Sequence, residues 1–178
     1  ARDEEIHESR LIELIDEEGL NYMSSVVLGL NDALVEFTGA LAGYTFALQH
    51  AKLVALTGAI TGIAAALSMA ASEYLSTRTE NDVHKNALKA AVYTGIAYVI
   101  TVVVLILPFV LLSNVYWGLG VCLFGALVII AIFNYYYSIV KTESFRHRFT
   151  EMAIISIGIA AISFLIGYAL RVFTGIEL

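Results

Sequence analysis

The sequence is poor in charged residues, proline and cysteine. Only 15% of its 178 residues are charged, whereas 59% are hydrophobic. A soluble domain of this length needs far more polar surface, so the composition excludes an ordinary water-soluble globular fold. The single cysteine, Cys122, excludes a disulfide framework and a thiolate metal cluster. With a net charge of −6 and no basic stripe, nucleic-acid binding is also unsupported.

The sequence instead contains long runs without a charged residue. Leu53–Ser72 is 20 residues long and Met152–Leu170 is 19, and each length crosses a hydrocarbon core of about 30 Å. The 51 residues between Lys89 and Lys141 are too many for one span, so the chain must turn within Leu107–Gly118, which holds the only proline. The sequence therefore predicts an all-α membrane protein with five transmembrane helices: Ser24–Leu48, Leu53–Thr77, Ala90–Leu112, Val115–Ile139 and Thr150–Arg171.

Lysine and arginine gather on one side of these predicted spans. The opposite side has only Lys52 and Arg171. The side that bears the N-terminus has Arg2, Arg10, Arg78, Lys85, Lys89, Lys141, Arg146 and Arg148. The positive-inside rule then predicts a cytoplasmic N-terminus and a C-terminus outside the cell, in the cell membrane if the source is prokaryotic.

The first 20 residues differ in composition from the rest, because they hold eight of the sixteen acidic residues. Their apolar residues recur at helical spacing, which predicts an acidic amphipathic cytoplasmic helix ending near Gly19. The predicted domains are therefore this helix over residues 1–20 and a five-helix transmembrane domain over residues 21–178. Glu4 and His7 form the E-x-x-H pair that di-iron bundles place on one helix. A solvated charged helix is the simpler interpretation of that pair.

Two carboxylates interrupt the first predicted span. Asp32 and Glu36 are four residues apart, so they share one face of a helix. An ionisable group at this depth costs about 2.5–3.5 kcal/mol on insertion scales, so that face cannot look toward lipid. Counting depth at 1.5 Å per residue places Met69 of the second span level with Asp32. Glu73 lies on the same face as Met69, nearer the cytoplasm.

Unpaired carboxylates inside a membrane either stay protonated or bind a cation. We predict a cation site formed by Asp32, Glu36, Met69 and Glu73, because no cationic side chain lies at their depth. The thioether of Met69 favours a borderline ion such as Fe²⁺. Alternatively, Met69 only packs against its neighbours. The supporting polar residues are Asn31, Thr61, Ser68 and Ser72. Alternatively, both carboxyls are neutral and hydrogen-bonded to Ser68, Ser72 or Thr61. No base lies level with the two serines, so we expect no enzyme.

Two pairs of glycines repeat at four-residue spacing. They are Gly39 and Gly43 in the first span, and Gly58 and Gly62 in the second. Small residues at this spacing let helices approach closely. The pairs predict tight packing of the first two spans, or of two protomers.

The motifs NDALVEFTGALAG (31–43) and ALSMAASEYLS (66–76) resemble the paired motifs of the vacuolar iron transporter family. The likeness runs from about Leu20 to the C-terminus. It implies a homodimer that moves Fe²⁺, with Mn²⁺ as a second substrate, out of the cytosol in exchange for protons, with no tightly bound cofactor. The family's aspartate falls on Asp32, and its Ser-Met pair on Ser68 and Met69.

The chain departs from plant and protozoan members of that family in two places. Thr61 stands where those members have a glutamate, and we expect Glu36 and Glu73 to replace that carboxylate. The connection from Arg78 to Lys89 is short, whereas those members insert a long Glu- and Met-rich cytosolic domain there. This difference puts the family's cytosolic metal-gathering step in doubt.

Some prokaryotic relatives carry a rubrerythrin-like, ferritin-type domain ahead of the membrane part. The acidic start of this chain is similar to the last helix of such a domain, in which case Glu4 and His7 are remnant di-iron ligands. The expected partners are divalent metal ions, protons, membrane lipid, a second copy and an upstream ferritin-like domain. Two functions stay open: metal transport, or a non-transporting dimeric membrane anchor for a cytosolic metal-binding domain.

Overall fold

The computed structural model describes residues 17–79, 86–141 and 144–175. Glu4 and His7 lie outside the described residues, as does most of the connection between the second and third spans. Within the described ranges every element is helical: α2 (Glu17–Asp32), η1 (Ala33–Phe37), α3 (Thr38–Leu48), α4 (Ala51–Thr79), α5 (Ala87–Leu111), α6 (Val115–Lys141) and α7 (Phe145–Thr174).

Five of these helical stretches are long and apolar enough to cross a membrane. The first is continuous through α2, η1 and α3, over Ser25–Leu48, and the other four correspond to α4, α5, α6 and α7. The predicted all-α fold with five transmembrane helices is therefore confirmed. The backbone of a charge-free run in lipid must make its hydrogen bonds internally, as a helix does. The length of each charge-free run therefore predicted the position of a span.

One local prediction differs from the structure. The helix predicted to end near Gly19 has no break there, because α2 runs through that residue. A glycine inside a helix costs only about 1 kcal/mol relative to alanine, so it does not force an end. The turn predicted within Leu107–Gly118 is confirmed, and Pro108 lies inside α5 just before it. The chain turns after Leu112, and the Asn114 side chain starts α6 by accepting hydrogen bonds from the backbone N–H groups of Tyr116 and Trp117.

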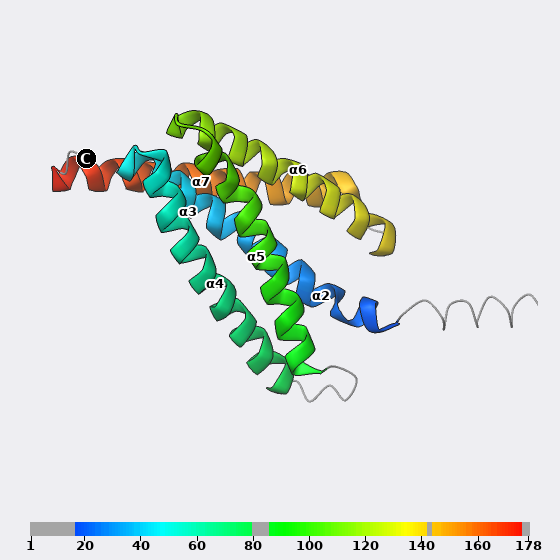
Figure 1. Ribbon diagram of the computed structural model, residues 1–178. Helices are drawn as coiled ribbons and strands as arrows, with labels where there is room; N and C mark the ends of the chain where they lie inside the picture. The colour runs from blue at the N-terminus through cyan, green and yellow to red at the C-terminus, as the bar shows by residue number, and fades with distance from the viewer. Residues whose placement is uncertain (1–16, 80–85, 142–143, 176–178) are drawn as a thin grey trace, which may run out of the picture.

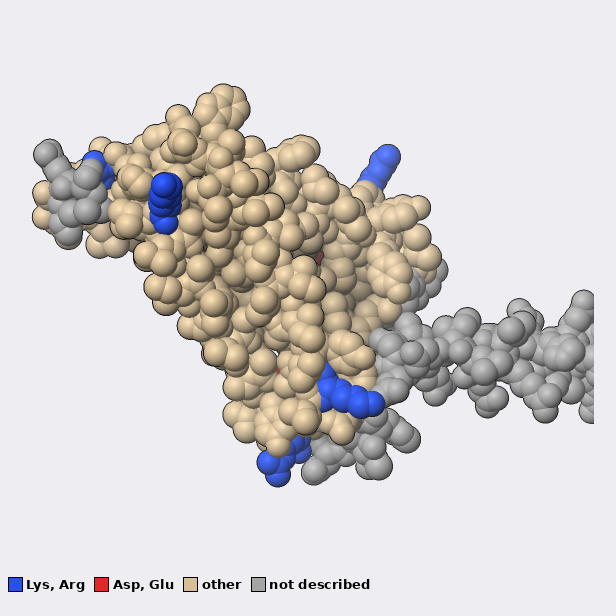
Figure 2. All heavy atoms as spheres, viewed as in Figure 1, with Lys and Arg blue, Asp and Glu red and all other residues tan. Residues whose placement is uncertain are grey.

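Two close helix pairs join the spans, α4 with α5 and α3 with α7. Figure 1 shows α4 and α5 running side by side, while α6 and α7 diverge from them. The first span links the two pairs, because its α2 part packs mainly on α5 and its α3 part packs mainly on α7. The buried core lies where these elements meet, around Phe37, Leu41 and Tyr98. In the view of Figure 2, lysine and arginine lie at the ends of the molecule, and the broad surface between them is free of them.

The two glycine pairs have different partners. A Cβ atom on Gly43 would lie 3.1 Å from the backbone oxygen of Ser163 in α7, and Gly167 of α7 approaches the Gly43 backbone still more closely. Within the chain, the first-span pair therefore packs against the fifth span and not against the second span, which was one of its two predicted partners. Gly58 does face the first span, since a Cβ there would lie 2.8 Å from Leu41. Spacing indicates close approach but does not identify the partner helix.

Candidate functional site

The first span contains a π-helical turn, η1, at its centre. Such turns hydrogen-bond from i to i+5, are rare, and occur frequently at functional sites. The carbonyl oxygen of Leu34 in this turn accepts hydrogen bonds from two hydroxyls. Thr38 donates one from the next helical turn, and Ser156 of α7 donates the other over 2.9 Å. The π turn is thus tied to the fifth span, which holds its irregular backbone in place.

Asp32 directly precedes this π turn, and Glu36 lies within it. Their carboxyl groups lie close enough to interact directly, so the two predicted residues do come together. Asp32 is half-buried, whereas Glu36 is exposed at the surface of the single chain. Two adjacent carboxylates repel one another when both are ionised, and a shared proton or a bound cation removes that repulsion. Among the described residues, no three His, Cys, Asp or Glu side chains of the single chain lie close enough together to hold a metal ion.

The hydroxyl of Tyr98, in the middle of α5, faces the same carboxyls. Both Asp32 and Glu36 act on it electrostatically. The Tyr98 side chain is 0% exposed, and Glu36 is the neighbouring group able to accept a hydrogen bond from its hydroxyl. A carboxyl pair and a buried phenol from a neighbouring helix therefore lie together at the level of the π turn.

Glu73 lies apart from this pair, toward the end of α4 that bears Arg78. It accepts a hydrogen bond of 2.6 Å from the Ser25 hydroxyl near the start of the first span. Because the two helices run in opposite directions, this bond agrees with the predicted depth of Glu73, nearer the cytoplasm than Asp32 and Glu36. The structure thus places a third carboxylate between the carboxyl pair and the predicted cytoplasmic side.

The other predicted residues are less closely connected to the carboxyl pair. Met69 is half-buried and packs against the hydrophobic core, which is the packing role given above as its alternative. Thr61 shares a hydrogen bond of 3.1 Å with Tyr44, farther along the two spans. Asn31 is half-buried, and Ser68 and Ser72 are exposed on α4.

Within the described residues, the three hydroxyls that were expected to hydrogen-bond to neutral carboxyls do not contact them in this way. No hydrogen bond joins Asp32 or Glu36 to Ser68, Ser72 or Thr61 there. The predicted alternative, in which these three hydroxyls satisfy the buried carboxyls, therefore has no contact in the structure that supports it.

Sequence reasoning missed Tyr98, although a signal was present. Thr94, Tyr98 and Thr101 recur at helical spacing within an otherwise apolar span, and all three are buried. A polar stripe on a helix in lipid faces other protein, so this pattern marks the side of α5 turned toward the first span. Thr94 confirms that orientation, since its hydroxyl donates to the Ser25 carbonyl oxygen over 2.9 Å.

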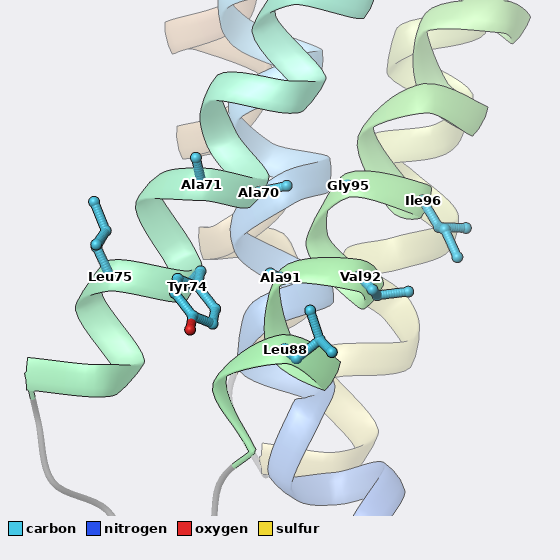
Figure 3. Close-up of a pocket in the computed structure, with 9 residues that line it drawn as sticks. All are labelled: Ala70, Ala71, Tyr74, Leu75, Leu88, Ala91, Val92, Gly95 and Ile96. Carbon is cyan, nitrogen blue, oxygen red and sulfur yellow. The ribbon is translucent and has the colours of Figure 1, made fainter.

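A hollow of about 660 Å³ lies between α4 and α5, away from the carboxyl pair, and its lining is almost wholly apolar. Figure 3 shows Ala70, Tyr74, Ala91, Val92 and Gly95 around it. This surface offers little to a cation and suits a lipid chain or another apolar helix.

Comparison with known proteins agrees with the motifs. A family model described as the VIT family matches residues 23–89, a range that holds the first two spans, Asp32, Glu36, Met69 and Glu73. No curated protein matches the chain. VIT family members are transporters, which indicates a membrane metal ion transporter. Residues 23–89 of this chain are therefore similar to the VIT family, and the five-helix fold agrees with that likeness.

Proposed function

We propose that this protein moves Fe²⁺, with Mn²⁺ as a second substrate, out of the cytosol in exchange for protons. The observation that carries the proposal is the pair of adjacent carboxyls, Asp32 and Glu36, at a π turn in the middle of the first span. Each ionised carboxylate is costly at this depth, and the pair is costlier still. A membrane anchor has no use for ionised carboxylates at this depth, whereas a cation carrier needs them as ligands.

The exchange with protons follows from the chemistry of the pair. A divalent cation requires ionised carboxylate ligands, and in its absence the same oxygens in a low-dielectric site favour protons. Metal and protons therefore compete for one site. Outward movement of the metal and return of the empty carrier with protons bound is the antiport cycle that this competition supports.

Other residues set the preferred metal and the direction of transport. Met69, at the predicted depth of Asp32, supplies a soft thioether that favours Fe²⁺ over harder ions. Glu73, bonded to Ser25, is positioned to receive the ion first from the cytoplasmic side. The predicted topology puts the N-terminus in the cytoplasm and the C-terminus outside, in the cell membrane if the source is prokaryotic.

The orientation of Glu36 supports a dimer. In the single chain this carboxylate is exposed in the middle of a membrane span, where contact with lipid is unfavourable. A second copy that covers it along a two-fold axis would also double the number of carboxylates at that depth.

The proposal is tested by metal flux into inverted proteoliposomes. We expect the parent protein to transport Fe²⁺ and Mn²⁺, and Asp32→Asn, which keeps the shape and removes the charge, to lose at least about 90% of the flux while folding normally. Asn114→Asp, which adds a carboxylate at an exposed helix cap outside the site, is the control and should transport at the parent rate. Equal flux from the parent and Asp32→Asn would contradict transport through this pair and favour the membrane anchor.

A further inference from the structure

The hollow between α4 and α5 is a groove in the apolar surface of the molecule (Figure 3). Its floor lies where the two helices approach closely, since a Cβ atom on Gly95 of α5 would lie 3.2 Å from the Cβ atom of Ala70 of α4. Its rim carries the larger side chains of Leu75, Leu88 and Ile96, all of which are exposed. The volume of about 660 Å³ lies within the range of pockets that hold small molecules in proteins.

The length of the groove matches one leaflet of a membrane. Along α5 its lining runs from Leu88 to Ile96, which at 1.5 Å per residue is about 12 Å. One leaflet contributes about 15 Å to the hydrocarbon core. Leu88 lies in the first turn of α5 and Leu75 in the last two turns of α4, so the groove begins at the end of both helices that is predicted to be cytoplasmic. An acyl chain that enters from that interface fits along it.

Basic side chains lie at this end of the groove. Arg78, in the last turn of α4, is exposed, and its guanidinium lies 5.7 Å from the ring centre of Tyr74, which lines the groove. The Tyr74 hydroxyl accepts a hydrogen bond of 3.5 Å from that guanidinium. Lys89 is exposed near the start of α5. Glu73 of α4 accepts a hydrogen bond from Ser25 of the first span and does not line the groove. The described residues thus combine an apolar groove with a positively charged end.

We propose that this groove binds an anionic phospholipid of the predicted cytoplasmic leaflet, with one acyl chain between α4 and α5 and the phosphate beside Arg78. Basic pockets between transmembrane helices on the cytoplasmic side recognise anionic headgroups. A second copy of the chain fits less well, because a two-fold axis along the groove would bring the two Arg78 side chains to the same level, where like charges repel. The proposal is independent of the ion site, since the groove lies away from Asp32 and Glu36.

Direct lipid binding tests the proposal. The purified protein in mild detergent is titrated with phosphatidylglycerol or with phosphatidylcholine of the same acyl chains, and bound lipid is counted by native mass spectrometry. We expect phosphatidylglycerol to bind at least about fivefold more tightly than phosphatidylcholine. Arg78→Gln should lower the affinity for phosphatidylglycerol about fivefold, as for the loss of one basic residue near anionic lipid. Ala71→Phe, which adds a ring to the lining of the groove, should weaken the binding of both lipids.

Arg146→Gln is the matched control. It removes an exposed arginine on the same predicted side of the membrane, but from α7, which does not line the groove. This variant should bind both lipids as the parent does. Equal affinity of the parent for the two lipids would overturn the proposal, as would equal losses in Arg78→Gln and Arg146→Gln. Since both arginines are exposed, neither replacement should lower the unfolding temperature.

Ala71→Phe separates a bound lipid from a bound copy. Parent-like lipid binding by this variant would show that the acyl chain does not lie in the groove. A change from dimer to monomer in Ala71→Phe, with lipid binding unchanged, would assign the groove to an interface between copies. Either result would contradict the proposal.

Discussion

Asp32 and Glu36 are the two residues on which the proposed ion site depends most. A carboxylate inside an apolar span is costly, so its presence alone marks a position that needs an explanation. The structure adds that the two carboxyl groups interact and that the turn holding them is π-helical. The π turn was not predictable from the sequence, because its freed carbonyl at Leu34 is satisfied by Ser156, which is 122 residues away along the chain.

Met69 is the residue by which the site should tell one metal from another. Met69→Leu keeps the volume that packs against the core and removes the soft sulfur ligand. We expect the apparent affinity for Fe²⁺ to fall roughly tenfold, while that for Mn²⁺ changes less than about twofold. Competition between the two ions in a flux assay measures both.

Met152→Leu provides the matched control for this prediction. Met152 packs against the same core from α7. That variant should leave the preference between Fe²⁺ and Mn²⁺ unchanged. Equal losses for both metals in Met69→Leu would show that Met69 serves packing, as its contacts with the core also allow.

Among the elements, the close approach of α3 and α7 is the contact most sensitive to a single added atom. A Cβ atom on Gly167 would collide with the backbone of Gly43, which cannot move aside as a flexible side chain can. Gly167→Ala should therefore lower stability by about 1–3 kcal/mol through overpacking. Thermal unfolding in mild detergent measures the effect.

Gly158→Ala is the control on the same helix, since a Cβ there meets nothing within 4 Å. It should leave the unfolding temperature unchanged or raise it slightly, because alanine is the better helix former. If the two variants unfold at the same temperature, α3 and α7 do not pack as closely as the structure shows.

The elements also show what sequence could and could not predict. Charge-free length predicted five spans because the thickness of the membrane fixes the length of a helix that crosses it. The antiparallel arrangement of neighbouring spans also explains why Glu73 was expected near the start of the first span, where Ser25 binds it. The partner of Gly39 and Gly43 was predicted wrongly, and Tyr98 was missed, because both depend on which helices pack together. Helical spacing alone does not contain that information.

For the whole molecule, the exposed Glu36 carboxylate predicts a second copy against the first span. With Cys122 replaced by alanine, single cysteines introduced along this span should cross-link between copies at Leu28, which is exposed, and at Val35, which is half-buried and adjacent to Glu36 in the chain. A cysteine at Leu34 or Ala42, buried against the rest of the chain, should not cross-link. Cross-linking with helical periodicity in membranes supports the two-fold arrangement. Monomeric elution in mild detergent together with no cross-links at any position would contradict it.

The proposed coupling between metal and proton movement involves the whole transport cycle. Its most direct measurement records metal and proton movement together, in one preparation of proteoliposomes that holds a pH-sensitive dye. An imposed gradient of Fe²⁺ or Mn²⁺, with no initial pH difference, should drive protons in the opposite direction, and Asp32→Asn should abolish both movements. Metal flux that continues at the same rate at every pH, with no accompanying proton movement, would contradict the account.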